Sequence, residues 1–534
     1  MLCGIMMYRK SKSKEFMASF PFSATAVGTG FLAAATTWVG CSVTDEQVSS
    51  KPNILFFFVD DMGWQDTSVP FWSERTPFND LYHTPNMERL AAEGMKFTQA
   101  YACAVCSPSR TSLMTGMNAA RHGVTNWTLR RDTSTDRNCE ILEMPEWNVN
   151  GLQPVDTVPR SVYANNLAEI LRKEGYFTIH SGKAHWGAMD TPGADPLNLG
   201  FDINIAGHAA GGLGSFLGEK NFGNTEKGTH TLPWGVPGLE QYHGDTVNLT
   251  DVLTVEATKA LDKARETGKP FYLYMSHYTV HVPLEPHHPY YQKYRDMGLE
   301  EPEARYASML EGMDASLGML MDYLDENGLT ENTVVIFMSD NGGLSAHLRG
   351  GERHTHNRPL NSGKGSAYEG GIRVPMLVKW PGIVESGSEN GDYLIMEDFF
   401  PAILDIAGVE DYETIQHVDG VSFMPHLLQE GGTAAGRSLV WHYPNRWGDD
   451  GPGIGTTSTI RSGDWKLVYW YKDESFELFN ITDDIGEANN MAEAEPGIMR
   501  ELATELGEYL REVGADRPAY RSTGRPAPWP DEAL

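Results

Sequence analysis

Residues 53–59 read Asn-Ile-Leu-Phe-Phe-Phe-Val, and the acids Asp60 and Asp61 follow at once. A continuous apolar run of this length is typical of a strand that is buried on both faces of a parallel sheet. Further along the chain, strand-like runs alternate with helical patterns. The strands are expected at 177–180, 271–275, 333–338 and 376–379, and the helices at 87–93, 161–174, 251–265 and 306–327. This alternation predicts an α/β fold with a mainly parallel sheet flanked by helices.

The pattern changes after about residue 435. Short strands are expected there at 458–461, 465–471 and 476–479, followed by a helix at 497–513. They predict a smaller C-terminal subdomain, made of an antiparallel sheet plus one helix. We therefore expect a catalytic domain at 50–434 and the C-terminal subdomain at 435–534, after a signal segment at 1–41.

Composition and charge exclude several classes of protein. Of the 534 residues, 42 are Lys or Arg and 72 are Asp or Glu, which gives a net charge of −30. A field of that sign repels nucleic acid, so no nucleic-acid partner is expected. The hydrophobic fraction of 40% and the mean hydropathy of −0.38 exclude a disordered chain and a multi-span membrane protein.

The first residues have the pattern of a secretion signal. Basic residues between Arg9 and Lys14 precede an apolar run at 16–40, and Cys41 follows Gly40 as at a bacterial lipoprotein cleavage site. Lipidation at Cys41, plain secretion with cleavage near the same place, and a retained anchor are the three readings. All of them predict an exported protein, in the periplasm or on the cell surface as an outer-membrane lipoprotein with a lipid anchor.

Three cysteines lie beyond the signal segment, namely Cys103, Cys106 and Cys139. An odd number in an exported protein suggests that one thiol has its own chemistry, and the local sequence indicates Cys106. For Cys103 and Cys139, a disulfide and two buried unpaired thiols remain open.

Polar side chains follow four of the expected strands. In open α/β sheets, ligands bind beyond the carboxyl ends of the strands, so these side chains are expected to form a single site. They are Asp60 and Asp61, Lys183 and His185, the weaker candidate His277 with His281, and Asp340 and Asn341.

The stretch Cys106-Ser107-Pro108-Ser109-Arg110 resembles the C-x-P-S-R signature of the type I sulfatases. The resemblance extends over nearly the whole chain from Lys51 to Asn480, and it implies an alkaline-phosphatase-like fold that hydrolyses sulfate esters. It also implies that Cys106 is oxidised to formylglycine by a formylglycine-generating or anaerobic sulfatase-maturating enzyme. The hydrated aldehyde would attack sulfur with one hydroxyl and expel sulfate with the other. Arg110 would stabilise and orient this diol.

The same resemblance assigns a metal site and the sulfate contacts. Asp60-Asp61-Met62-Gly63 and Ser339-Asp340-Asn341-Gly342-Gly343 resemble the metal motifs of the family, with modified Cys106 beside them. All-oxygen ligation favours Ca²⁺ over Mg²⁺. The residues matched to catalysis are Lys183 and His185 in a G-K-x-H-x-G element, His281 as a sulfate ligand and proton donor, and Lys364 as the second lysine. Glu369 and Arg373 are expected to be structural.

The substrate is predicted less directly. A sulfated polysaccharide or oligosaccharide is expected, contacted by His and Arg side chains on loops near the mouth of the site. The candidates are His208, His347, His442 and Arg446, with Arg349, His354 and His356 on comparable stretches. Two other functions remain open, a phosphate or phosphonate hydrolase of the same superfamily and an inactive glycan-binding homologue.

Overall fold

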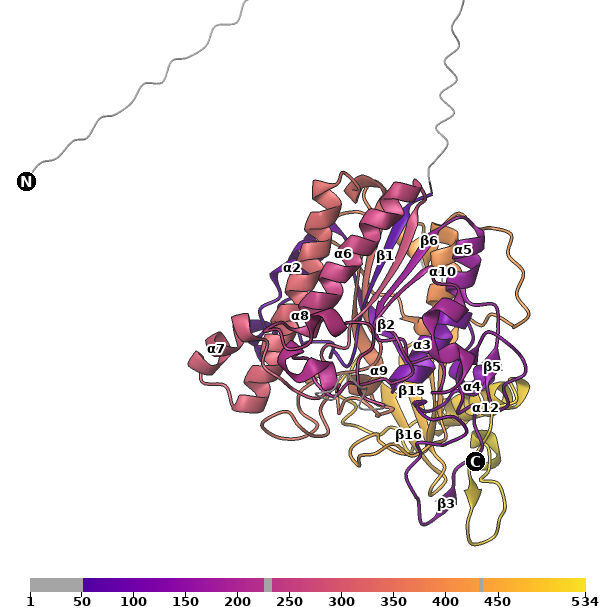
Figure 1. The fold of residues 1–534 in the computed structure, drawn as a ribbon. Coiled ribbons are helices and arrows are strands. Elements are labelled where there is room, and N and C mark those ends of the chain that lie inside the picture. Colours follow the sequence, from indigo (N-terminus) through magenta and orange to yellow (C-terminus); the bar gives the residue numbers. More distant parts are fainter. Residues whose placement is uncertain (1–50, 225–232, 432–435) are drawn as a thin grey trace, which may run out of the picture. The chain divides into compact units, whose positions relative to one another are not determined.

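Among the residues that the computed structural model describes, 51–224, 233–431 and 436–534, a nine-stranded sheet forms the centre of the fold (Figure 1). The strand order is β11-β2-β10-β9-β1-β8-β6-β7, and β12 also pairs with β2. All pairs are parallel except those that β10 makes with β2 and β9. The strands are β1 Asn53–Val59, β2 Met95–Tyr101, β6 Phe177–Gly182, β7 Ile203–Ile205, β8 Phe271–Ser276, β9 Thr333–Ser339, β10 Arg373–Lys379, β11 Ser388–Asn390 and β12 Leu394–Ile395. The predicted α/β fold with a mainly parallel sheet is confirmed.

The central strand β1 explains why the sheet is covered on both faces. Successive side chains of a strand point to opposite faces. Ile54, Phe56 and Phe58 belong to one hydrophobic core, whereas Leu55, Phe57 and Val59 belong to the other. An uninterrupted apolar run is therefore required here, because neither face of β1 meets solvent.

Helices cover each face of the sheet (Figure 1). The helices α2 Pro85–Glu93, α6 Leu249–Thr267 and α8 Glu301–Glu326 pack on the face of Leu55, and α3 Cys106–Thr115, α5 Leu167–Lys173 and α10 Phe399–Ile406 pack on the other face. The shorter helices are α1 Pro77–Leu81, α4 Ala119–His122, α7 His288–Asp296, α9 Glu369–Ile372 and α11 Met424–Leu427. No helix in the described ranges is long and apolar enough to cross a bilayer.

A second sheet is formed by the C-terminal part of the chain. It has the antiparallel order β13-β14-β15-β16, with β13 Ser438–Tyr443, β14 Thr457–Ser462, β15 Trp465–Trp470 and β16 Ser475–Asn480. The helix α12 Pro496–Glu512 packs against it, and their apolar side chains share one core. Short pairs link β3 Leu142–Glu143 to β17 Ala519–Tyr520 and β4 Leu152–Gln153 to β5 Val162–Tyr163. The expected sheet plus helix is confirmed, while the domain boundary at 434/435 stays a prediction.

Two sequence expectations differ in detail from the structure, and one open alternative is decided. The helix expected at 161–174 begins only at Leu167, because the Asn166 side chain accepts a hydrogen bond from Glu169 N and caps it there. The strands β2 and β13 were not predicted. Cys103 and Cys139 are buried and unpaired, so the expectation of two free thiols is the one that the structure supports. The signal segment and Cys41 lie outside the described residues.

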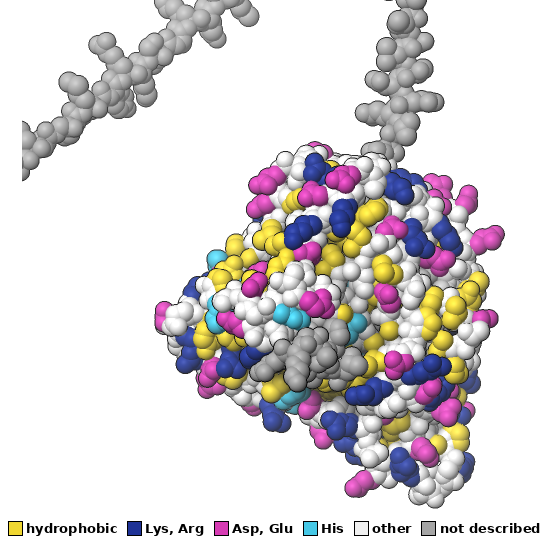
Figure 2. All heavy atoms as spheres, viewed as in Figure 1, with side chains coloured by type: hydrophobic (Ala, Val, Ile, Leu, Met, Phe, Trp, Pro, Cys, Tyr) yellow, Lys and Arg dark blue, Asp and Glu magenta, His cyan; other side chains and the backbone are white. Residues whose placement is uncertain are grey.

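Charged side chains of both signs are spread over the face drawn in Figure 2. The net charge of −30 is therefore not gathered into one acidic patch on that face. Between the two sheets, by contrast, charges are buried: Lys466 Nζ lies 3.0 Å from Glu369 Oε1 and 2.8 Å from Glu487 Oε1, and all three side chains are fully buried. Glu369 also accepts from Tyr101 and Arg373, so the expected structural role of Glu369 and Arg373 agrees with these contacts.

The buried acid Glu397, just before α10, makes stability depend on pH. Burial, and then the neighbouring Asp398, raise the pKa of Glu397 from its ordinary 4.5 to about 8. The folded protein thus keeps a proton that the unfolded chain releases, so stability falls as pH rises through this window. In Glu397→Gln, we expect the free energy of unfolding to fall less steeply with pH, by about 1 kcal/mol per pH unit. Urea unfolding between about pH 5 and pH 8 measures it.

Glu397 and Glu508 line one surface hollow, but only Glu508 is exposed. Glu508→Gln is therefore the matched control. This variant should keep the pH dependence of the wild type. An unchanged slope in Glu397→Gln would show that Glu397 is already ionised in the folded protein.

Candidate active site

Three carboxylates meet at the carboxyl ends of two neighbouring strands. Asp60 and Asp61 follow β1, and Asp340 follows β9, which pairs with β1 in parallel. One oxygen from each acid lies within 4.8 Å of the others, and all three side chains are buried. Asn341 joins them, since its Nδ2 donates to Asp61 Oδ1 at 2.9 Å. The structure therefore brings all four predicted metal-binding side chains together.

The backbone of Asp61 helps to place two successive carboxylates in one cluster. Consecutive side chains in an extended strand would point to opposite faces. Asp61 has a φ of +61°, in the left-handed region that residues other than glycine seldom adopt, and the chain turns there. His185 has a φ of +57° on the other side of the site. Such conformations are found most often at functional sites.

The donor set fits a hard divalent cation. Asp60 Oδ1 and Asn341 Oδ1 are buried and have no hydrogen-bond partner in the described part of the chain. Buried oxygens are rarely left unpaired, and carboxylate and amide oxygens are the ligands that Ca²⁺ prefers. Burial raises the pKa of Asp60 well above its ordinary value, although Lys183 opposes this. A bound cation would favour the ionised acid.

Cys106 is the first residue of α3, and its side chain is almost completely buried. One helical turn later, Arg110 is fully buried and donates from Nε to Asp340 Oδ2 at 3.0 Å. Arg110 also donates from Nη1 to Ser276 Oγ at 2.7 Å. The signature arginine thus connects the helix of Cys106 to the acid cluster. Burial raises the pKa of the Cys106 thiol, while Lys183 and Lys364 act in the opposite direction.

Two buried lysines face the acids. Lys183 Nζ lies 2.8 Å from Asp60 Oδ2, and Lys364 Nζ lies 2.6 Å from Asp61 Oδ1. Burial favours neutral Asp61, but the charges of Lys364, His281 and Lys183 together outweigh it and hold the pKa of Asp61 below its usual range. Two ammonium groups beside Cys106 provide the converging positive charge that an anionic substrate requires.

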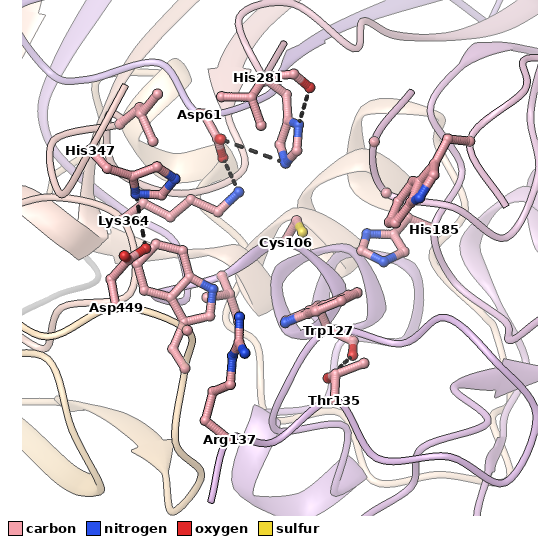
Figure 3. A pocket seen from close by; sticks show the side chains of 18 residues that line it. Asp61, Cys106, Trp127, Thr135, Arg137, His185, His281, His347, Lys364 and Asp449 are labelled. Atoms are coloured by element: carbon pink, nitrogen blue, oxygen red, sulfur yellow. Dashed lines mark hydrogen bonds and ion pairs between the residues drawn. The ribbon is translucent and has the colours of Figure 1, made fainter. Parts of the chain in front are cut away.

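Two histidines complete the surroundings of Cys106 (Figure 3). His185 Nε2 lies 2.8 Å from Thr128 O, while its Nδ1 is buried with no hydrogen-bond partner among the described residues. His281 Nδ1 lies 2.9 Å from Val282 O, and its Nε2 is 3.9 Å from Asp61 Oδ2. Burial, and then Lys364, lower the pKa of His281 to about 3. Each ring therefore has one nitrogen held by a backbone carbonyl and the other available.

A cavity of about 330 Å³ opens above Cys106, a volume within the range of small-molecule sites. Its lining includes Asp61, Cys106, His185, His281 and Lys364. The glycine-rich stretch expected near the site contributes Gly211 and Gly212. A Cβ at residue 211 would lie 2.1 Å from His185 Cε1, so the ring of His185 occupies the space that a side chain would fill.

The structure brings one of the four predicted substrate-binding residues to this cavity. His347 lines it, and its Nδ1 lies 2.9 Å from Asp449 Oδ2. The other three do not line it. His442 is buried in the C-terminal sheet against Ser458 and the carbonyl of Asp516, and Arg446 pairs with Asp450 over a separate hollow.

The His208 side chain does not line the described cavity, and its backbone carbonyl accepts from His185 N. The structure thus places His442 and Arg446 away from this cavity, while a role of His208 in substrate binding stays a prediction. Two weaker candidates are also structural. The ring of His277 contacts Ser316 inside the core, and Arg349 forms buried ion pairs with Asp66 and Glu303.

Three other side chains at the mouth of the cavity escaped the sequence analysis, namely Trp127, Arg137 and Trp447. Trp447 is the residue after Arg446, so the sequence indicates the correct stretch of chain, but Trp447 and not Arg446 lines the cavity. Its ring packs on Gly365, where a Cβ would lie 2.2 Å from Cε3 of the indole. No motif surrounds Arg137, and the same loop carries Arg130 and Arg131, so the sequence alone does not single Arg137 out.

Comparison with known proteins agrees with this site. Residues 52–409 match the family model described as Sulfatase, and residues 363–516 match the model described as N-sulphoglucosamine sulphohydrolase, C-terminal. A sulfatase of Formosa agariphila is 30% identical over 518 residues, covering 88% of this chain and 90% of its own. The N-acetylgalactosamine-6-sulfatase of Canis lupus familiaris is 28% identical, covering 83% and 76%.

Solved structures show the same fold. Ps i-CgsB in complex with k-i-k-neocarrahexaose has a TM-score of 0.68 and 26% identity, covering 86% of this chain and 93% of its own. The phosphonate monoester hydrolase of Agrobacterium radiobacter has a TM-score of 0.58 and 19% identity, covering 88% and 99%, which shows the fold alone. Since the Sulfatase model spans more than half of the chain, the chain belongs to the sulfatase family of sulfuric ester hydrolases.

Proposed function

We propose that the protein removes sulfate from a sulfated polysaccharide or oligosaccharide, through formylglycine at residue 106 and one calcium ion. The observation that carries the proposal is the position of Cys106. It is the first residue of its helix, at the floor of the cavity, with the acid cluster, two lysines and two histidines around it. As formylglycine, this residue would supply a hydrated aldehyde that attacks sulfur and later releases sulfate.

The acid cluster would hold the calcium ion through Asp60, Asp61, Asp340 and Asn341, with residue 106 beside them. Bound there, the ion would polarise the sulfate oxygens. Lys183 and Lys364 carry positive charge in a buried site, where it stabilises negative charge more than it would in water. Arg110 links the helix of residue 106 to Asp340, to Ser276 and to the backbone of Lys183 through three hydrogen bonds.

His281 has the right position for the leaving group. Its Nδ1 donates to Val282 O, so Nε2 is the nitrogen free to serve the leaving group. Because burial and Lys364 lower the pKa of the ring, Nε2 would take up its proton only once the negative charge of a bound sulfate ester offsets the lysines. A departing sugar alcohol is a poor leaving group and benefits from a general acid at hydrogen-bonding distance. His185 lies across the cavity and would contact the sulfate through Nδ1.

The names of similar proteins support a carbohydrate substrate. The relatives include an N-acetylgalactosamine-6-sulfatase, and a structure with the same fold is solved with a neocarrahexaose. An exported, lipid-anchored enzyme in the periplasm or on the cell surface would meet such glycans outside the cytoplasm. Oxidation of Cys106 would be performed by a formylglycine-generating or anaerobic sulfatase-maturating enzyme before or during export.

Two measurements test the proposal. Peptide mass spectrometry of protein coexpressed with a maturation enzyme should show the aldehyde at residue 106, and this protein should release sulfate from sulfated oligosaccharides. A protein that carries the aldehyde yet releases no sulfate from any sulfated sugar or aryl sulfate would overturn the proposal.

Calcium binding has a readout of its own. Metal-free protein should gain thermal stability on addition of Ca²⁺, and less on addition of Mg²⁺, because a ligand that binds only the folded state stabilises it. Asp340→Asn should reduce this gain, whereas Asp325→Asn, on an exposed side chain of α8, should keep it. Equal gains in the two variants would place the ion elsewhere.

A further inference from the structure

Arg137 is an unpaired cation at the mouth of the cavity. Its guanidinium points toward the centre of the cavity from the side opposite Asp61 and His281 (Figure 3). Within the described residues, the Arg137 side chain makes no hydrogen bond or ion pair.

The acids nearest to Arg137 are occupied by other groups. Asp449 lines the same cavity, but its Oδ2 lies 2.9 Å from His347 Nδ1. Asp136, the preceding residue, accepts from Asn126 Nδ2 at 2.8 Å through Oδ1 and from Trp147 Nε1 at 3.0 Å through Oδ2. The guanidinium is therefore left available to an anion from solution.

The loop that carries Arg137 is fixed in place. Further hydrogen bonds to Asp136 come from Ser134 at 2.7 Å and from Asn445 at 3.1 Å. The backbone is held as well, because Arg137 N donates to Arg446 O at 3.0 Å. A cation on a rigid loop binds with less loss of conformational entropy than one on a mobile loop.

Aromatic rings line the cavity beside this cation. Trp127 and Trp447 line the cavity together with Arg137, and the Trp447 ring packs on Gly365, the neighbour of Lys364. Indole faces offer flat apolar surfaces that suit the apolar faces of sugar rings. The cavity thus has the proposed sulfate site at its floor, the two indoles in its wall, and the cation Arg137 at its rim.

We propose that Arg137 binds a second anionic group on the same glycan, so that the substrate is an oligosaccharide carrying a further sulfate or carboxylate beyond the ester that is cleaved. This inference rests on the proposed function and narrows its substrate class. The planar guanidinium can donate two parallel hydrogen bonds to either anion. It defines specificity and takes no part in the cleavage of the ester.

The test compares matched sugars. A disaccharide with one sulfate is compared with the same disaccharide bearing a second sulfate, or a carboxylate, on the adjacent ring. We expect Arg137→Gln to lower kcat/KM for a doubly anionic sugar about 10- to 100-fold more than for the monosulfated one. The doubly anionic sugar that suffers the larger loss in kcat/KM shows whether Arg137 prefers a sulfate or a carboxylate.

Arg131→Gln is the control, because Arg131 lies on the same loop and is exposed like Arg137, but does not line the cavity. It should leave the ratio between the two kinds of sugar unchanged. Equal losses on both kinds of sugar in Arg137→Gln, or no loss on either, would overturn the inference. Calorimetric binding of the same sugars separates the two proposals: selective loss of binding without any hydrolysis would support the subsite and contradict the sulfatase mechanism.

Discussion

Cys106→Ser is expected to lower kcat/KM for a sulfated oligosaccharide by about a thousandfold or more, the scale on which removal of a nucleophile acts. Serine cannot be oxidised to the aldehyde by the same route, and a sulfated serine has no second hydroxyl with which to expel sulfate. The residual rate would come from the lysines and the metal site alone. Initial rates on a sulfated sugar and on an aryl sulfate measure the loss.

The control for this variant is Cys103→Ser. Cys103 is also buried near α3, but it lines a different hollow and does not contact the cavity above Cys106. This variant should keep most of the activity, and both variants should unfold at temperatures close to that of the wild type. Activity of Cys106→Ser near that of Cys103→Ser would exclude formylglycine as the nucleophile.

Lys466→Met is expected to lower the free energy of unfolding by about 3–5 kcal/mol, the cost of leaving a buried charge uncompensated. Lys466 lies between Glu369 and Glu487, and none of the three side chains reaches solvent. Burial raises the pKa of Glu487 to about 7 even with Lys466 present. Without the ammonium group, both acids would oppose ionisation more strongly. Urea unfolding at neutral pH gives the difference.

Two further variants test whether the loss of stability comes from the buried charges. Lys472→Met changes an exposed lysine two residues beyond β15 and should cost less than about 1 kcal/mol. The double variant Lys466→Met with Glu487→Gln should recover part of the stability, because one of the uncompensated acids is gone. If Lys466→Met were no less stable than Lys472→Met, the buried ion pairs would contribute nothing to the fold.

Local sequence was sufficient for the residues nearest to the reaction. β1 and β9 each consist of a buried apolar run that stops at an acid, and parallel pairing then brings Asp60 and Asp340 to the same edge. The signature around Cys106 and the lysines at 183 and 364 could be recognised from neighbouring residues alone. These side chains could be expected to meet because the strand period and the motifs are local properties, and the structure brings them together.

The rim of the cavity could not be predicted in this way. Arg137 comes from the loop between α4 and β3, and Trp447 from beyond β13, so their meeting depends on contacts between distant segments. His442 shows the same limit, because sequence does not say which face of β13 packs inward. Similarly, β2 mixes Lys96, Thr98 and Gln99 with apolar residues and has no clear alternation.

Trp447 places a side chain of the C-terminal segment in the wall of the cavity. Its indole forms one wall of the cavity, while the nucleophile and the lysines belong to the larger sheet. A chimera that receives residues 435–534 from a relative should therefore change its preference among glycans while keeping its chemistry. Such a graft must also bring acceptable partners for Glu369, because Lys466 and Glu487 travel with the exchanged segment. An exchange of this segment between relatives must therefore preserve the buried ion pairs of Lys466, whereas the residues at the rim of the cavity can vary.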